Sequence, residues 1–131
     1  MGKMHAKIYK KFPDVTLVGI VGRNVSKTMV EANSLETKAY TNPYDLINND
    51  EVEVIDVCYP TAIHAEYVIS ALNRGKHVLC ETPLAYKIEE AEEMLNAAKL
   101  NNRLLLVALY DRFQNITNFI DDEQLRDGES L

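Results

Sequence analysis

Residues 52–85 read VEVIDVCYPTAIHAEYVISALNRGKHVLCETPLA, and this stretch decides the fold. A β-branched apolar run predicts a strand, a Pro-Thr pair begins a helix, and a glycine ends that helix before a second apolar run. Strand, helix and strand in this order predict a right-handed βαβ unit with parallel strands. The elements are expected at residues 52–58 (strand), 62–74 (helix, begun by Pro60 and Thr61 and ended by Gly75) and 77–80 (strand).

The same alternation continues on both sides of this stretch and predicts an α/β fold with a doubly wound, Rossmann-like parallel sheet. The run LLLVAL at residues 104–109 is typical of a strand that is covered on both faces. The other elements are expected at residues 2–12 (helix, with Met4, Ile8 and Phe12 on one face), 15–21 (strand), 26–33 (helix), 38–40 (edge strand), 43–47 (helix) and 88–101 (helix, with Ile88, Ala91, Leu95 and Ala98 on one face).

Composition favours a single cytoplasmic domain that binds a small molecule. The 131 residues, 47% of them hydrophobic, suffice for one core, and the net charge of −6 argues against a nucleic-acid partner. No apolar run reaches the roughly 20 residues of a membrane span. Residues 1–27 contain six basic residues and one acid, Asp14. This basic surplus suits binding of a nucleotide phosphate or, equally, a helix face exposed to solvent. Cys58 and Cys80 are expected to be buried free thiols, and no metal site is predicted.

Ligands of a doubly wound sheet bind beyond the carboxyl ends of its strands. Four such ends carry most of the unusual polar and aromatic residues of this chain, although each segment taken alone is ordinary loop chemistry. Together they predict one crevice. The segments are residues 22–24, 59–61, 81–83 and 110–113.

These motifs resemble the nucleotide-binding half of the Gfo/Idh/MocA family, named after glucose-fructose oxidoreductase, inositol dehydrogenase and the rhizopine catabolism protein. The turn YPTAIH at residues 59–64, GKHV at 75–78 and ETP at 81–83 follow the family order, in which the last motif reads E-K-P. MGKMHA at residues 1–6 resembles the end of the family's glycine-rich loop. The resemblance implies an NAD- or NADP-dependent oxidoreductase acting on sugars, cyclitols or related alcohols.

The chain departs from the family pattern at its beginning. The family's first, central strand and the first two glycines of its G-x-G-x-x-G loop would precede Met1, and only Gly2 stands for the last glycine. The strands at 15–21 and 52–58 would then pair with each other, accept a strand from another chain, or flank a strand encoded upstream. We expect the last alternative, in which the sequence is a truncated reading frame or a fragment of a longer protein.

A second departure lies at the other end, where the family continues into a substrate-binding domain. We expect residues 1–120 to form an incomplete dinucleotide-binding domain and residues 121–131 an acidic tail that begins the missing domain. That domain normally supplies the proton-exchanging acid or histidine and most subunit contacts. The isolated chain is therefore expected to be inactive, and neither its substrate nor its oligomeric state, a homo-oligomer included, can be read from the sequence.

The candidate catalytic residues are Glu81 and Thr82, of which Thr82 takes the position of the family lysine. A hydroxyl can donate a hydrogen bond but cannot change charge near neutral pH, so another proton carrier would be needed. Glu81 could equally assist the start of the next helix. At residues 23–27, RNVSK stands where an NAD enzyme places an acid, which favours NADP over NAD unless the segment is an ordinary exposed turn.

The predicted cofactor contacts each have a structural alternative. His64 could bond local backbone, Tyr59 and Tyr110 could cover the edge of the core, and Arg112 could form an ordinary ion pair. His5 and His77 are expected to be packing or strand-start residues. The contacts are Gly2, Lys3, Met4, Arg23, Asn24, Tyr59, Pro60, Thr61, His64, Glu81, Pro83, Tyr110 and Arg112.

Three classes of function follow from the sequence. A dinucleotide-dependent oxidoreductase explains the motifs best. A nucleotide-sensing module without chemistry would suit Thr82, and a structural module would bind no ligand. In the first class the partner is a small sugar or polyol, with neither nucleic acid nor membrane involved.

Overall fold

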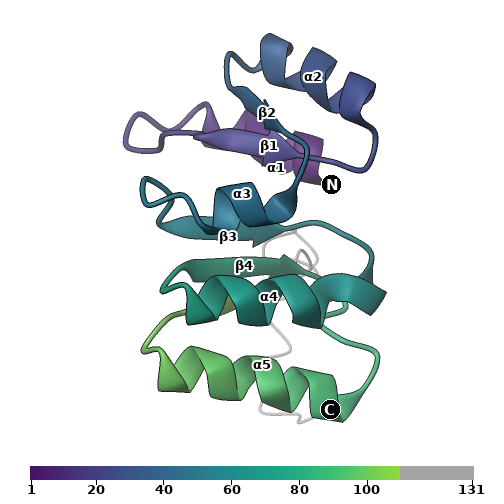
Figure 1. Ribbon diagram of the computed structural model, residues 1–131, viewed down its shortest axis with the longest axis vertical. Helices are drawn as coiled ribbons and strands as arrows, with labels where there is room; N and C mark the ends of the chain where they lie inside the picture. Colours follow the sequence, from purple (N-terminus) through teal and green to yellow (C-terminus); the bar gives the residue numbers. More distant parts are fainter. Residues whose placement is uncertain (110–131) are drawn as a thin grey trace, which may run out of the picture.

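A computed structural model describes residues 1–109 and has alternating helices and strands (Figure 1). The elements are α1 (Gly2–Tyr9), β1 (Gly19–Val21), α2 (Val25–Ser34), β2 (Lys38–Tyr40), α3 (Pro43–Ile47), β3 (Val54–Val57), the 3-10 turn η1 (Thr61–Ile63), α4 (His64–Asn73), β4 (His77–Glu81), α5 (Ile88–Leu100) and β5 (Leu105–Ala108).

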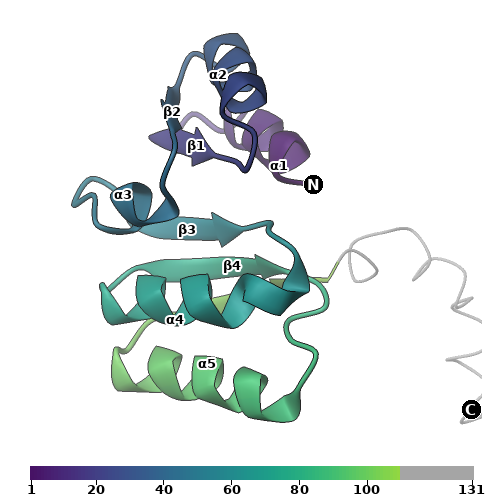
Figure 2. The ribbon, with the colours of Figure 1, turned by 45° about the vertical axis from the view of Figure 1, so that its right-hand side comes forward.

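All the strands of the described residues are parallel and form two sheets, β1–β2 and β3–β4–β5. Gly19 lies opposite Lys38 in the first sheet, and Val54 lies opposite His77 in the second. Figures 1 and 2 show the β1–β2 sheet beyond the β3 edge of the larger sheet. The predicted α/β, Rossmann-like fold is confirmed, whereas direct pairing of the strands predicted at 15–21 and 52–58 is not observed, because β1 and β3 belong to different sheets.

The main core lies between the larger sheet and the helices α4 and α5, which cover one of its faces (Figure 2). Adjacent residues of a strand point to opposite faces, so Val57, Val78 and Cys80 face these helices while Asp56 and Glu81 face the other side. The buried members of the core are Ile47, Val57, Val68, Ala71, Leu72, Val78, Cys80, Met94, Ala97 and Ala98.

The predicted apolar faces of two helices are wrong by about one position. In α5 the predicted Ala98 is buried, together with Met94 and Ala97, because the small alanines let the helix approach its neighbours, whereas the predicted Ile88 and Leu95 are 74% and 47% exposed. In α1 the buried residues are His5 and Ala6 rather than the predicted set of Met4, Ile8 and Phe12.

Strand β5 is covered on one face by α5, and the expectation of cover on both faces is wrong for the described residues. Leu104 and Leu106 are 62% and 56% exposed. Their side chains lie on the face of the sheet that α4 and α5 do not cover.

Several predicted elements are shorter in the structure, among them α1 and β1. Helix α1 ends at Tyr9 because Lys11 N and Phe12 N bond the carbonyls three residues back, which tightens the chain into a turn. Strand β1 is limited to three residues because its partner β2 is equally short, and the Thr37 hydroxyl instead donates to the Leu17 carbonyl at 2.6 Å.

Helix α2 begins at a side-chain cap that can be tested by substitution. Asn24 Oδ1 accepts a hydrogen bond from the Lys27 backbone N–H at 2.9 Å. Replacing Asn24 with alanine is expected to lower the free energy of unfolding by about 1 kcal/mol, because one N–H of the first turn loses its acceptor. Urea denaturation measures the change. Asn24→Asp keeps an acceptor oxygen and is expected to stay close to the parent protein; an equal loss in both variants would contradict the capping role.

Candidate functional site

The first turn of α1 lies against the end of β3. A Cβ atom added to Gly2 would stand 3.3 Å from Cys58 Cβ, so the helix start and the residue after β3 are in close contact. No side chain caps this helix, and its first turn contains no acid. Backbone N–H groups at an uncapped helix start attract anions, which suits a phosphate group.

The segment after β1 presents Arg23 at the surface. Burial and the neighbouring Tyr67 raise the pKa of Tyr59, and the positive charge of Arg23 acts in the opposite direction. A shallow depression of ≈ 410 Å³ on α2 is lined by Ser26, Lys27, Val30 and Glu31. The predicted contact Asn24, in contrast, uses its side-chain oxygen to cap α2.

The segment after β3 is held by His64. This imidazole is 1% exposed, and its Nε2 and Nδ1 lie 2.6 Å and 3.1 Å from the backbone carbonyl oxygens of Tyr59 and Leu84. His64 therefore ties the segment after β3 to the segment after β4. Its contact with Tyr59 is the local backbone contact of the structural alternative, whereas its contact with Leu84 was not predicted. Pro60 precedes η1, and Thr61, the first residue of η1, is buried.

The ring of Tyr59 packs in a row of aromatic side chains. Its centroid lies 5.3 Å from that of Tyr67, which in turn lies 5.8 Å from Tyr44. The position agrees with the alternative reading of Tyr59 as a residue that covers the edge of the core.

The segment after β4 contains the candidate catalytic residues. Glu81 is the last residue of β4 and is 7% exposed, and its Oε2 accepts a hydrogen bond from the Thr82 backbone N–H at 3.1 Å. Thr82 itself is exposed. The Thr82–Pro83 peptide bond is cis, which the sequence alone did not reveal.

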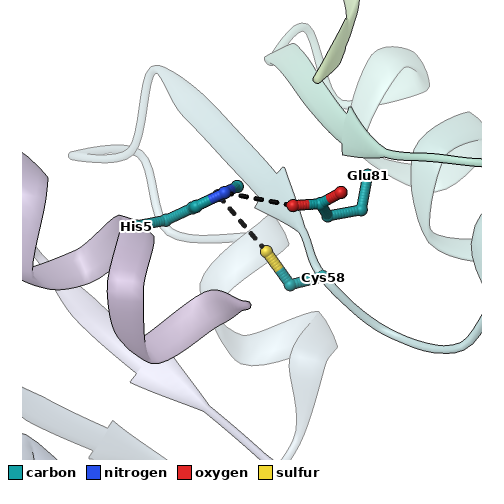
Figure 3. Close-up of side chains that lie close together, drawn as sticks. All are labelled: His5, Cys58 and Glu81. Carbon is teal, nitrogen blue, oxygen red and sulfur yellow. Dashed lines mark hydrogen bonds and ion pairs between the residues drawn. The ribbon is translucent and has the colours of Figure 1, made fainter. Parts of the chain in front are cut away.

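A buried polar cluster connects α1 to the larger sheet, and sequence reasoning missed it. His5 Nδ1 donates to Asp56 Oδ2 at 2.7 Å, and His5 Nε2 lies 3.1 Å from Glu81 Oε1 (Figure 3). The Tyr9 hydroxyl also donates to Asp56 Oδ2, at 2.6 Å. The available signal was Asp56, an acid inside the apolar run VIDVC, because a charge at a strand position that faces the interior needs partners.

The acids of this cluster keep neighbouring groups protonated. Burial, followed by the hydrogen bond to Asp56, raises the pKa of Tyr9, and burial together with the Asp56 charge raises the pKa of Cys58. The Cys58 thiol accordingly donates to Asp56 Oδ1 at 3.3 Å. Burial also raises the pKa of Cys80 to about 12. Both cysteines are free thiols, as expected.

The remaining predicted residues have different surroundings. Lys3 forms an ion pair with Glu31 of α2, so its ammonium already has a partner. Met4 is 42% exposed in the first turns of α1. His77 fills its expected role at a strand start, where its Nδ1 accepts from Leu104 N at 3.0 Å. Tyr110, Arg112 and the domain boundary near residue 120 lie outside the described residues.

The contacts therefore bring together the start of α1 and the segments after β3 and β4. The charge of Arg23, in the segment after β1, acts on Tyr59 in the segment after β3. The family model "Oxidoreductase family, NAD-binding Rossmann fold" matches residues 1–109. The chain belongs to the Gfo/Idh/MocA family.

Members of the Gfo/Idh/MocA family similar to this chain include sugar and inositol dehydrogenases. Myo-inositol 2-dehydrogenase of Thermotoga maritima is 32% identical over 86% of this chain and 34% of its own length. D-glucoside 3-dehydrogenase of Escherichia coli is 29% identical over 95% of this chain and 34% of its own length. The crystal structure of GenD2 from gentamicin A biosynthesis, in complex with NAD, superposes with a TM-score of 0.78 at 25% identity over 82% of this chain and 31% of that one.

The chain thus spans about a third of the length of the curated relatives it matches. Within the part of the chain that the structure describes, no helix has the length and apolar character needed to cross a bilayer.

Proposed function

We propose that this chain is the dinucleotide-binding part of an oxidoreductase that acts on an alcohol carbon of a sugar, cyclitol or related compound. When bound, the nicotinamide would accept or donate the hydride. The observation that carries the proposal is the contact of α1 with the segment that follows β3 and with the end of β4, in a chain of this family. The substrate class is supported by the inositol and glucoside dehydrogenases among its relatives.

Different residues of the chain would bind different parts of the dinucleotide. The free N–H groups at the start of α1 would hold the pyrophosphate. Arg23 would contact the ribose end, and its exposed guanidinium favours the 2′-phosphate of NADP. The segment Glu81–Thr82–Pro83 would border the nicotinamide, with the exposed Thr82 hydroxyl donating a hydrogen bond to the substrate oxygen.

Binding can be tested by thermal unfolding of the full chain with NADP and with NAD. A ligand that binds only the folded state raises the midpoint of unfolding, and we expect the larger rise with NADP. Replacing Arg23 with alanine is expected to weaken NADP binding about three- to tenfold and to leave NAD binding unchanged, because only NADP carries the extra phosphate.

The matched control is Lys38→Ala, which removes an exposed cation at the opposite end of the strands. Equal losses for both dinucleotides in Arg23→Ala would contradict the NADP preference. No stabilisation by either dinucleotide would contradict the proposed function itself.

A second candidate, a nucleotide-binding module without chemistry, is favoured by one observation: Thr82 at the position of the family lysine cannot carry a proton to or from an alcohol near neutral pH. The test follows reduction of the bound dinucleotide in the presence of inositols and sugars. Turnover of any of them would contradict the module, whereas absence of turnover is expected of this chain under both candidates.

A further inference from the structure

Both ring nitrogens of His5 face carboxylate groups of the larger sheet. Nδ1 lies 2.7 Å from Asp56 Oδ2, and Nε2 lies 3.1 Å from Glu81 Oε1. The side chains of His5 and Glu81 are each 9% exposed, and that of Asp56 is 16% exposed. Figure 3 shows the imidazole reaching from α1 toward Glu81. The ring therefore lies between two acids that belong to the neighbouring strands β3 and β4.

Asp56 accepts hydrogen bonds from three groups. The Tyr9 hydroxyl donates to its Oδ2 at 2.6 Å, and His5 Nδ1 donates to the same oxygen at 2.7 Å. The Cys58 thiol donates to its Oδ1 at 3.3 Å. A carboxyl group that only accepts is in its ionised form. Asp56 thus holds a proton on His5 Nδ1, and the charge of the ring is decided at Nε2.

The contact between His5 Nε2 and Glu81 requires a proton. Glu81 Oε2 accepts from the Thr82 backbone N–H at 3.1 Å, while Oε1 is buried and makes no hydrogen bond among the described residues, although it lies within ion-pair distance of Nε2. A neutral ring with its proton on Nδ1 would turn the Nε2 lone pair toward this oxygen, in a site with little water to screen the repulsion. Imidazole is a stronger base than a carboxylate, so the proton belongs on Nε2.

The groups around the ring favour its positive form. They are Tyr9 of the same helix, Asp56 in β3, Cys58 after it, and Glu81 in β4. Burial and Asp56 raise the pKa values of Tyr9 and Cys58, so both stay neutral donors. The charged groups that contact the ring within the described residues are therefore the two acids. Without a positive ring, these buried acids would lack a cation in contact.

We propose that His5 is an imidazolium that joins Asp56 to Glu81 and thereby positions the start of α1 against the segment after β4. Its backbone lies in α1, and its side chain ends on β3 and β4. Glu81 in turn holds the N–H of Thr82. In terms of binding, which rests on the proposed function, the bridge fixes the N–H groups for the pyrophosphate relative to the segment that would border the nicotinamide. His5 is thus a positioning residue that acts through Glu81.

The protonation of the ring can be read from long-range ¹H–¹⁵N NMR spectra of the ¹⁵N-labelled 131-residue chain, without dinucleotide. At about pH 8 an ordinary histidine is neutral and has one bare nitrogen, whereas His5 is expected to show two protonated nitrogens. His77 is the internal reference, because its Nδ1 accepts from Leu104 N and carries no proton. The His5 signals are assigned by their loss in His5→Asn. A bare Nε2 in the parent chain would overturn the proposal.

Glu81→Gln tests whether Glu81 holds the second proton. The carboxamide N–H can donate to Nε2, so the ring is expected to become neutral and to show one bare nitrogen in a protein that circular dichroism shows to be folded. A merely structural contact would not change the protonation of the ring. Two protonated nitrogens in folded Glu81→Gln would overturn the role of Glu81.

His5→Asn tests the positioning of α1. Its amide can still donate to Asp56, but Glu81 loses its partner, and we expect the α1 amides to exchange with solvent at least about tenfold faster. The matched control is Lys7→Ala, an exposed residue of the same helix, which is expected to leave the exchange unchanged. Unchanged exchange in folded His5→Asn would overturn the positioning role.

Binding of NADP and NAD to His5→Asn is expected to weaken equally, about three- to tenfold, because both dinucleotides contain the pyrophosphate. This loss differs from the one expected for Arg23→Ala, which concerns NADP alone. Unchanged affinity for both dinucleotides would overturn the positioning of the binding site. If the parent chain bound neither dinucleotide, the proposed function would fail, while the NMR spectra and the exchange of α1 would still decide the charged bridge.

Discussion

Replacing Leu72 with alanine is expected to lower the free energy of unfolding by about 2–5 kcal/mol. Leu72 lies in α4 with 0% of its surface exposed, among the residues that join this helix to the larger sheet. Removing the isobutyl group forfeits its burial and leaves a cavity that close-packed neighbours fill only in part. The loss would be a large share of the stability of a domain of this size.

Urea denaturation followed by circular dichroism measures this loss, and Leu100→Ala is the matched control. Leu100 ends α5 and is 87% exposed, so the same substitution there is expected to change the free energy by no more than about 0.5 kcal/mol. Similar values for the two variants would mean that the core between α4, α5 and the sheet does not dominate stability.

His64→Ala is the second substitution with a large expected effect, about 2–4 kcal/mol of unfolding free energy. The change leaves the carbonyl oxygens of Tyr59 and Leu84 without the imidazole, in a site where the side chain is 1% exposed. It also frees the segments after β3 and β4 from each other. We therefore expect weaker dinucleotide binding in addition to lower stability.

His64→Gln distinguishes the contribution of the hydrogen bonds to stability from that of the packing of the ring. Its amide N–H can still donate to one carbonyl, so its stability is expected to lie between those of the parent and His64→Ala. Urea denaturation gives the order of the three proteins. If His64→Ala were as stable as the parent, the ring would have no structural role, and the prediction that His64 contacts the cofactor would gain support.

Much of the fold could be predicted because the periodicity of apolar residues is a local property. Residues 52–85 give β3, α4 and β4 within a few positions, and Gly75 adopts the positive φ of 76° that lets a glycine end a helix. The ends of β1 could not be predicted, because they depend on the length of a partner strand. The buried face of α5 depends on the neighbours that its alanines approach.

Topology alone selects candidate residues at the strand ends, whose roles in binding stay predictions, but it does not reveal clusters that depend on side-chain contacts. The rule that ligands meet strand ends gave Arg23, Tyr59 and Glu81. His5 was assigned to packing because its partners Asp56 and Glu81 lie far from it in the sequence. Only the packing of α1 against the larger sheet brings these residues together.

The division between β1–β2 and β3–β4–β5 makes stability uneven along the chain. Backbone hydrogen bonds between paired strands make the strands unfold together, and in the described residues no such bonds join β1 to β3. The large buried side chains Leu72, Met94 and Val68 all lie on the side of the larger sheet. We therefore expect local opening of β1, α2 and β2 to require less free energy than unfolding of the remainder, to which His5 and Tyr9 tie α1. On this expectation the part of the fold that presents Arg23 opens most readily, and a bound dinucleotide would gain affinity only after ordering it.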